Sequence, residues 1–339
     1  MSLLEVANVS HRYQTTTGPR PVLDQVGLEL GAGEILAIVG ESGCGKTTLG
    51  RLVARLAKPT AGEVRFDGRD IWGLKGRELA AYRRAVQVVQ QDPYGSLNPG
   101  LTIRASLAPA LRHHHIVPRD QLREELLRLL QVVGLDATDD FLRRYPHQLS
   151  GGQRQRVAIA RAISLRPRLI VADEAVSMLD VSMRVSVLDL MLSLRSGSDL
   201  AYLFVSHDFG VVRYFTRGGR VLVMFYGVVV EEGPAEDVIA RPRHPYTYLL
   251  RQAIPIADPE QAQRNRAEDV HERTEGEPAN TGCVFANRCP FAEAVCRTTR
   301  PPLVEQASGH LAACLFPERV PDLRAMQSPD AAQLPHAAR

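Results

Sequence analysis

A glycine-rich stretch near the N-terminus contains the residue types that bind phosphate groups. Residues 40–47, GESGCGKT, fit the pattern G-x-x-x-x-G-K-[ST]. Its glycines let backbone N–H groups turn toward the phosphates, its lysine neutralises their charge, and its threonine hydroxyl can ligate Mg²⁺. The segment follows a predicted strand and begins a predicted helix, as this motif requires. The predicted nucleotide-binding residues are Gly40, Glu41, Ser42, Gly43, Cys44, Gly45, Lys46, Thr47 and Thr48.

A second set of residues can complete the chemistry of a nucleoside triphosphatase. The run LIVADE, residues 169–174, is a buried strand that ends in two carboxylates. Asp173 is predicted to join Thr47 around Mg²⁺, and Glu174 is predicted to polarise the attacking water. Glu174 and Lys46 are therefore the candidate catalytic residues.

A third motif, LSGGQRQR at residues 149–156, offers another place for an anion. Ser150 can cap a helix, and Gly151 and Gly152 expose the backbone N–H groups at its start. One nucleotide cannot easily use two such sites in one chain. We therefore predict a dimer in which Ser150, Gly151, Gly152 and Gln153 close on the partner's ATP.

The order and spacing of these motifs resemble those of the ATPase subunits of ABC transporters. The resemblance implies roles for four further residues. Tyr13 would stack on adenine, Gln91 in VVQQDP would sense Mg²⁺, and His207 in FVSHD would contact the γ-phosphate. Asp180 ends the segment SMLD, which would be the D-loop.

Other segments are similar to those of the oligopeptide/dipeptide importer ATPases, over about residues 3–318. They are QDPYGSLNP, RYPHQLSGGQRQR, RPRHPYTYLL and a cysteine-containing C-terminal part. The segment DEAVSMLD departs from the family pattern, because Ala175 replaces a proline and Met178 replaces an alanine. Losing the proline removes a rigid turn residue but leaves both carboxylates in place.

This resemblance implies a subunit that hydrolyses ATP to power peptide uptake. The implied partners are a second ATPase subunit, which would make a heterodimer, two membrane permease subunits and an extracytoplasmic solute-binding protein. An importer of nickel or another small solute is an alternative that the sequence leaves open. ABC ATPases of DNA repair or translation are a further alternative, but they usually carry two cassettes or a long coiled-coil insertion. The formal charge of +3 gives no electrostatic reason to expect nucleic acid as a partner.

Four of the five cysteines, Cys283, Cys289, Cys296 and Cys314, form the pattern C-x5-C-x6-C-x17-C near the C-terminus. Disulfides are not expected in a reducing compartment. Four thiolates suit tetrahedral Zn²⁺, but no pair has the short spacing of a zinc knuckle. An iron–sulfur cluster tolerates wider gaps, although the spacing matches no ferredoxin pattern. The family resemblance implies a [4Fe-4S] cluster with a structural or regulatory role, and Zn²⁺ is the alternative.

The elements that position these residues follow from hydrophobic patterns. Buried strands are predicted at residues 35–39, 169–173 and 200–208, and amphipathic helices at residues 49–56 and 122–133. An Asp67-Gly68 turn and a Gly134 C-cap are also predicted. The expected fold is an α/β P-loop ATPase with an antiparallel β subdomain and a helical subdomain near residues 92–165. The expected divisions are an ATP-binding domain over 1–250, a cysteine-containing region over 251–320 and a disordered tail over 321–339.

Composition limits where the chain can act. With 45% hydrophobic and 23% charged residues among 339, it is typical of a globular protein. The longest apolar runs are shorter than the roughly 20 residues that span a bilayer, and the N-terminus lacks a signal-peptide pattern. We therefore expect a peripheral protein at the cytoplasmic face of the cell membrane, attached through permease subunits.

Overall fold

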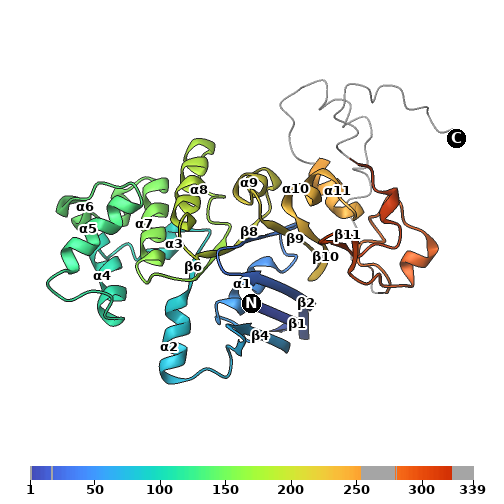
Figure 1. Ribbon diagram of the computed structural model, residues 1–339, viewed down its shortest axis with the longest axis horizontal. Coiled ribbons are helices and arrows are strands. Elements are labelled where there is room, and N and C mark those ends of the chain that lie inside the picture. The colour runs from blue at the N-terminus through green and yellow to red at the C-terminus, as the bar shows by residue number, and fades with distance from the viewer. Residues whose placement is uncertain (1, 17, 253–278, 280, 323–339) are drawn as a thin grey trace. The chain divides into compact units, whose positions relative to one another are not determined.

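A computed structural model describes residues 2–16, 18–252, 279 and 281–322 (Figure 1). The chain folds into two compact units. The first contains the residues up to Pro21, then Gln25–Leu36 and Thr47–Ser206; the second contains Val22–Asp24, Ala37–Lys46 and the residues from His207 onward. Each unit is considered in turn.

The first unit contains an antiparallel sheet with the strand order β2-β1-β4-β5. These strands are β1 (Ser2–Thr15), β2 (Gly18–Gly31), β4 (Ala61–Phe66) and β5 (Arg69–Asp70). Asp67 and Gly68 connect β4 to β5 with φ angles of 50° and 73°. Two consecutive positive φ angles are what a tight hairpin turn needs, so the predicted turn is confirmed.

The first unit also contains a parallel arrangement in which β7 lies between β6 and β8. Its strands are β6 (Val86–Val89), β7 (Leu169–Asp173) and β8 (Ala201–Ser206). The predicted strands at residues 35–39 and 169–173 coincide with β3 (Ile35–Val39) and β7. Because these pairs are parallel, the residues that follow β6 and β7 lie at the same edge of the sheet.

Helices fill the segment between β6 and β7. They are α3 (Pro93–Ser96), α4 (Ile103–His113), α5 (Leu122–Val132), α6 (Asp139–Arg143), a 3-10 turn (Pro146–Gln148) and α7 (Gly151–Ile163). The leucines predicted to share one face of α5 are all buried, and Gly134 follows this helix with a φ of 67°. The predicted helical segment and its glycine cap are confirmed.

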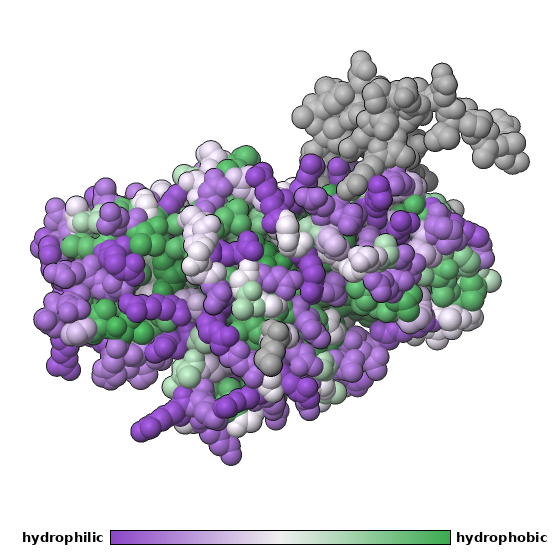
Figure 2. Space-filling model, viewed as in Figure 1, coloured by the Kyte–Doolittle hydropathy of each residue, from purple (hydrophilic) through white to green (hydrophobic). Residues whose placement is uncertain are grey.

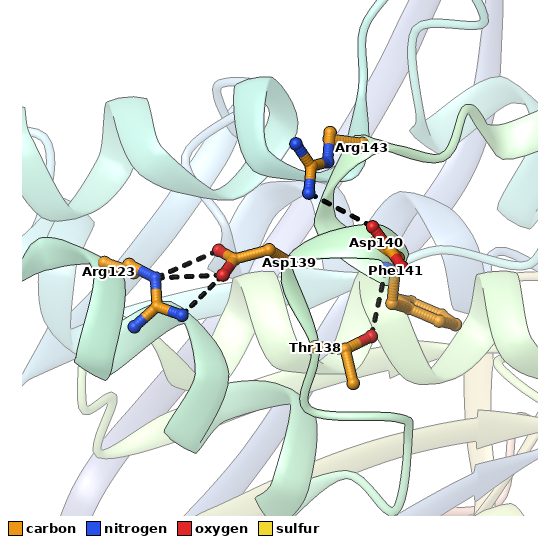
Figure 3. A network of polar contacts seen from close by, with 6 residues as sticks. All are labelled: Arg123, Thr138, Asp139, Asp140, Phe141 and Arg143. Atoms are coloured by element: carbon orange, nitrogen blue, oxygen red, sulfur yellow. Dashed lines mark hydrogen bonds and ion pairs between the residues drawn. The ribbon is translucent and has the colours of Figure 1, made fainter.

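Polar contacts join α5 to α6 (Figure 3). The Arg123 Nε lies 3.1 Å from each carboxylate oxygen of Asp139. The Thr138 hydroxyl caps α6 by accepting a hydrogen bond from the Phe141 N–H at 3.2 Å. These contacts fix the start of α6, which leads into the segment before α7.

Three further helices belong mainly to the first unit: α1 (Lys46–Val53), α2 (Gly76–Ala85) and α8 (Val181–Arg195). The prediction that the first of these helices extends to Leu56 was wrong. α1 ends at Val53, Arg55 has a φ of 58°, and the Leu56 side chain is 63% exposed. A left-handed residue cannot continue a right-handed helix, so it turns Leu56 away from the helix's buried face.

The second unit contains strands in the order β11-β12-β10-β9. Its elements are α9 (Phe209–Phe215), β9 (Arg220–Phe225), β10 (Val228–Pro234), α10 (Ala235–Ala240), α11 (Pro245–Gln252), a 3-10 turn (Ala294–Arg297), β11 (Val304–Ala307), β12 (His310–Ala312) and a 3-10 turn (Pro317–Arg319). Strand β12 pairs with β10, so the C-terminal hairpin extends the sheet that β9 and β10 form in this unit. In the part of the chain that the structure describes, no helix has the length and apolarity needed to cross a membrane.

A fully buried carboxylate fastens this C-terminal hairpin. The Glu231 side chain accepts hydrogen bonds from the backbone N–H groups of Arg243 at 2.6 Å and His244 at 3.0 Å. The His310 Nε2 lies 2.7 Å from the same carboxylate. Burying a carboxylate is costly unless it is fully hydrogen-bonded, so this cluster fixes β12 and the 243–244 turn against β10.

Residues 253–278 and 323–339 lie outside the described residues, and the predicted domain limits and disordered tail remain predictions.

Candidate functional site

The glycine-rich loop, residues 40–46, has a backbone that excludes side chains at two points. A Cβ atom on Gly40 would lie 2.2 Å from the Met224 carbonyl oxygen. At Gly45 the φ is 105°, and a Cβ would lie 2.8 Å from the Val22 carbonyl oxygen. Both positions therefore require glycine, for close backbone approach at Gly40 and additionally for conformation at Gly45. The loop consequently has the shape of a phosphate cradle.

The lysine of this loop rests on the loop's own carbonyl groups. The Lys46 Nζ donates hydrogen bonds to the carbonyl oxygens of Gly40 at 2.7 Å and Glu41 at 2.8 Å. Only 5% of Lys46 is exposed. The carbonyls hold the ammonium inside the loop, where it can neutralise phosphate oxygens.

Cys44 occupies a variable position of the motif and is 4% exposed. Burial raises the pKa of its thiol, although the nearby Lys46 ammonium opposes this shift. A buried protonated thiol is a poor nucleophile. Cys44 therefore fits the loop as a small buried side chain rather than as a reactive thiol.

Within the first unit, the structure brings together the two residues predicted to hold Mg²⁺. The Thr47 hydroxyl donates a hydrogen bond to the Asp173 carboxylate at 3.1 Å. A hydroxyl and a carboxylate are hard oxygen ligands, which suit Mg²⁺. The donor chemistry at this point therefore fits the predicted metal ion.

Glu174 has an unusual backbone conformation. It follows β7 with a φ of 48°, and its N–H donates to the Val205 carbonyl oxygen at 2.9 Å. Left-handed geometry costs free energy in a residue other than glycine and is often found at functional sites. The strand hydrogen bond thus holds the candidate general base in a fixed orientation directly after Asp173.

Gln91 and Tyr13 occupy positions consistent with their predicted roles. Gln91 is exposed two residues after β6, at the same sheet edge as Asp173. The half-buried Tyr13 lies 3.4 Å from the Thr48 hydroxyl through its own hydroxyl, and His11 packs edge-on against its ring. An aromatic face beside the first turn of α1 can accommodate a base.

The motif LSGGQRQR, residues 149–156, is called the signature segment below. It forms the N-terminus of α7. Ser150 and Gln153 make a reciprocal capping box: the Ser150 hydroxyl accepts from the Gln153 N–H at 3.3 Å, and the Gln153 side chain accepts from the Ser150 N–H at 3.1 Å. Both residues are accessible. The accessible start of α7 can therefore contact an anion that is bound to another subunit.

Asp180 ends the segment SMLD and caps α8. Its carboxylate accepts from the Met183 N–H at 2.9 Å, which is the main reason that its pKa is lowered. Met178 and Val181 on either side are 65% and 76% exposed. A fixed carboxylate flanked by exposed apolar side chains is suited to contact with another protein.

His207 is the first residue of the last segment of the second unit, and it directly follows β8. It is exposed, and the next residue, Asp208, caps α9 by accepting from the Gly210 N–H at 2.8 Å. The cap fixes the backbone at the point where His207 leaves the strand.

The four C-terminal cysteines converge. Cys283, Cys289, Cys296 and Cys314 line one pocket together with apolar residues such as Phe291 and Phe316. The pocket has a free volume of about 20 Å³, room for about one water molecule. Hydrophobic residues also gather on part of the surface of this region (Figure 2). One residue of the region, Val295, is 41% exposed.

Burial raises the pKa of three of the pocket's thiols, those of Cys283, Cys289 and Cys314, and so favours their protonated form. It raises the pKa of Cys289 to about 12 and that of Cys314 to about 11. Within the described ranges, no three His, Cys, Asp or Glu side chains are placed to hold a metal ion. The four predicted ligands thus line one pocket, and their binding of a metal ion stays a prediction.

Two regions of the chain match family models. Residues 23–177 match the model described as ABC transporter, and residues 230–296 match the one described as oligopeptide/dipeptide transporter, C-terminal region. Over 318 residues the chain is 43% identical to a Brucella ovis protein whose name refers to peptide import and ATP binding. That alignment covers 92% of this chain and 97% of the relative. The chain belongs to the ABC transporter ATPases.

Other ABC relatives agree. The oligopeptide transport ATP-binding protein AppF of Bacillus subtilis is 42% identical over 310 residues, covering 89% of this chain and 91% of AppF. A solved dimer of the ABC transporter cassette MJ0796, bound to ADP and Pi, has a TM-score of 0.60 and 30% identity. It covers 68% of this chain and 98% of the cassette. The predicted family and fold class are thereby confirmed.

Two residues beside the phosphate-binding loop of this ABC ATPase were missed in the sequence. The Arg288 guanidinium pairs with the Glu41 carboxylate, and the Tyr246 hydroxyl accepts a hydrogen bond from the Glu41 N–H at 2.8 Å. Tyr246 belongs to the segment RPRHPYTYLL, and Arg288 directly precedes Cys289. Both segments drew attention as family features, but neither pattern indicates a contact with Glu41.

Proposed function

We propose that this chain hydrolyses ATP to power the import of peptides. The observation that carries the hydrolytic part is the hydrogen bond between Thr47 and Asp173, which joins the two motifs predicted to hold one Mg²⁺. The peptide part is supported by the match of residues 230–296 and by relatives named for peptide import and oligopeptide transport. Another relative, from Pectobacterium atrosepticum, is named for import of glutathione, which is itself a peptide.

In the proposed mechanism, the loop N–H groups and Lys46 hold the β- and γ-phosphates of ATP. Thr47, Asp173 and Gln91 would hold Mg²⁺, which would supply positive charge to the phosphate oxygens. Glu174 accepts a proton from the attacking water as its oxygen bonds to the γ-phosphorus. The bond from the γ-phosphorus to the bridging oxygen breaks, and ADP and phosphate leave. His207 is assigned to the γ-phosphate, and Tyr13 is assigned to the adenine.

The proposed active form is a dimer with two composite sites. Ser150 and the N–H groups after it would approach the partner's γ-phosphate, and Asp180 would lie at the dimer contact. The exposed apolar side chains of Met178 and Val181 support an interface at this point. The solved MJ0796 dimer is a precedent for a cassette with this fold.

The proposed partners are a similar second ATPase subunit, two permease subunits and an extracytoplasmic solute-binding protein. The proposed location is the cytoplasmic face of the membrane, through the permeases. ATP-driven closure of the ATPase dimer would reorient the permeases, and hydrolysis would reopen it. The alternative assignment, nickel import, is not supported by the names of the relatives described above.

The test is transport by the complete complex in vesicles. The chain is co-purified with its membrane partners, reconstituted and supplied with the solute-binding protein and ATP. We expect uptake of a labelled di- or oligopeptide with wild-type chain and none with Glu174→Gln. Uptake of ⁶³Ni²⁺ instead, with no peptide uptake, would refute the peptide assignment but keep the importer. An active ATPase that copurifies with no permease would refute the importer.

We also propose that the four-cysteine pocket takes an iron–sulfur cluster rather than a single zinc ion. The convergence of four thiols in one pocket supports thiolate ligation, and the cysteine spacing, which lacks the short pairs of a zinc knuckle, favours the cluster over zinc. Because the pocket now has room for about one water molecule, loading requires it to open. The buried thiols must also lose their protons, so loading should release protons.

Anaerobic purification tests this assignment. Brown protein with absorbance near 400 nm and about four irons per chain is the expected result. Replacing Cys289 with serine should remove the colour, whereas Cys44→Ser should keep it. Colourless protein with one stoichiometric zinc, or with no metal at all, would refute the cluster.

A further inference from the structure

The loop between the first two pocket cysteines faces in two directions. Its ends, Cys283 and Cys289, line the thiol pocket. Its middle is a tight turn, because the Ala286 N–H donates to the Cys283 carbonyl and the Arg288 N–H to the Phe285 carbonyl, each at 3.0 Å. Arg288 projects from this turn to the Glu41 carboxylate of the ATP-binding loop, whereas Phe285 lines the thiol pocket and packs against Phe225 and Tyr246. The loop therefore carries two pocket thiols at its ends, and Arg288, which directly precedes Cys289, contacts residue 41.

Arg288 makes a closely fixed contact with Glu41. Its two terminal nitrogens lie 2.9 Å and 2.6 Å from the two oxygens of the Glu41 carboxylate. The guanidinium carbon also lies 5.2 Å from the centre of the Phe225 ring, and the Arg288 side chain is only 11% exposed. The Arg288–Glu41 ion pair is bidentate, and its arginine is buried against an aromatic ring. Solvent screening and the loss of side-chain entropy therefore weaken it less than they weaken an ordinary surface ion pair.

Glu41 is held at three points. Its side chain pairs with Arg288, its N–H donates to the Tyr246 hydroxyl, and its carbonyl accepts from the Lys46 ammonium at 2.8 Å. Tyr246 in turn packs against Phe225, with 4.6 Å between ring centres. Position 41 is variable in the G-x-x-x-x-G-K-[ST] pattern, so the motif alone does not call for this carboxylate.

The position of the Lys46 ammonium therefore depends partly on the C-terminal region. The carbonyl that receives Lys46 belongs to the residue that Arg288 holds. If Glu41 is released, the loop must hold its phosphate-ready shape without one of its anchors. Such a change should mainly lower nucleotide affinity, because the free energy needed to order the loop is subtracted from the free energy of binding.

We propose that Arg288 is a positioning residue of the ATP site and that it makes nucleotide affinity depend on the state of the Cys283–Cys289 loop. This inference rests on the proposed ATPase function. Arg288 touches neither substrate nor reacting atoms and acts through Glu41. A change at the thiol pocket that moves the loop would alter the Arg288–Glu41 contact and, through it, the loop that binds phosphate.

The first test measures nucleotide affinity and steady-state kinetics of the full chain. Arg288→Ala should weaken Mg-ATP binding and raise KM on the order of tenfold, because a charge-assisted contact is lost, whereas kcat should change by less than about twofold. Arg288→Lys should recover part of the affinity. Arg220→Ala is the matched control, because Arg220 forms an ion pair with Glu232 on the neighbouring strand β10. It should bind ATP like the wild type.

A double-mutant cycle shows whether Arg288 acts through Glu41. Glu41→Gln keeps the side chain's size and should give the same affinity loss, with no further loss when combined with Arg288→Ala. Glu41→Gln also gives an answer if Arg288→Ala fails to fold. Additive losses, or wild-type affinity in both single variants, would overturn the positioning role.

The second test asks whether the thiol pocket is coupled. Replacing both Cys283 and Cys289 with serine should change ATP affinity in the wild-type background and leave it unchanged in the Arg288→Ala background. An equal change in both backgrounds, or none in either, would overturn the coupling. A wild-type chain that neither binds nor hydrolyses ATP would instead refute the proposed function, so the two failures are distinguishable.

Discussion

The hydroxyl of Thr47 lies 3.1 Å from the carboxylate of Asp173, although 126 positions separate them in the chain. Thr47 lies in the first turn of α1, and Asp173 ends the central strand of the β6-β7-β8 arrangement. The packing of these elements brings a hydroxyl and a carboxylate to one point. This pair is the basis for assigning Mg²⁺ to residues that two separate motifs contribute.

Replacing Asp173 with asparagine should impair the use of Mg²⁺. The amide keeps the size of the side chain but removes the charge that attracts the ion, so hydrolysis at fixed Mg²⁺ should fall at least about tenfold. Thr47→Ser, which keeps the hydroxyl, is the matched control and should stay near wild type. Magnesium titrations of ATPase activity provide the measurement. Unchanged magnesium dependence in Asp173→Asn would remove Asp173 from the metal site.

Glu174→Gln should bind ATP normally and almost stop turning over. The amide keeps hydrogen bonding but cannot accept the water proton, and loss of a general base typically slows a reaction by ~10²–10⁴. Single-turnover hydrolysis and ATP binding should be measured on the same preparation. Activity within a few-fold of wild type would show that another group serves as the base.

Gly151→Asp should block hydrolysis without preventing ATP binding by the isolated chain. A Cβ at Gly151 would lie 3.8 Å from the Leu179 side chain, which is ordinary contact, so the fold should tolerate the change. The new carboxylate would repel the partner's γ-phosphate. At Gly152, by contrast, a Cβ would lie 2.6 Å from the Met183 sulfur, so substitution there would also disturb packing.

Mixed dimers make the test of the signature sharper. A Gly151→Asp chain combined with a Lys46→Ala chain retains at most one intact composite site if the signature acts across the dimer. In a homodimer assay we expect activity clearly below wild type. Full wild-type activity in the mixture would contradict the arrangement across subunits.

The stability of the protein should fall in acid partly because of His244. This side chain is buried, and burial lowers its pKa from 6.5 to about 3. Its Nδ1 accepts a hydrogen bond from the Tyr246 N–H at 3.1 Å, which requires the unprotonated nitrogen. The folded-state pKa is below the unfolded value, so this contribution is complete above about pH 6.5 and is lost as pH falls toward 3.

Over that window, His244 should contribute a slope of about 1.4 kcal/mol of unfolding free energy per pH unit. His244→Gln can keep an acceptor for the Tyr246 N–H but cannot bind the proton. Denaturant unfolding at several pH values should therefore show a shallower acid dependence for the variant. Identical slopes for the two proteins would mean that His244 does not stay neutral when folded.

The sequence by itself determined the motifs and most of the local structure. The strand limits at residues 35–39 and 169–173, the Asp67-Gly68 turn and the buried face of α5 follow from periodicity and turn chemistry. These features depend on residues that are close in the chain, where steric rules and hydrophobic spacing act directly. Leu56 is the exception, because the 3.6-residue pattern of apolar residues continues beyond Val53, where the helix ends.

Only the tertiary structure decided which distant residues meet. The Arg288–Glu41 pair spans 247 positions, and no spacing rule links an arginine beside a cysteine to a variable position of a phosphate-binding loop. Likewise, no sequence pattern predicts the pairing of β12 with β10, which joins the C-terminal hairpin to the sheet of its unit. Such contacts arise from the packing of whole elements, and the free energy that selects them belongs to the assembled core rather than to any local segment.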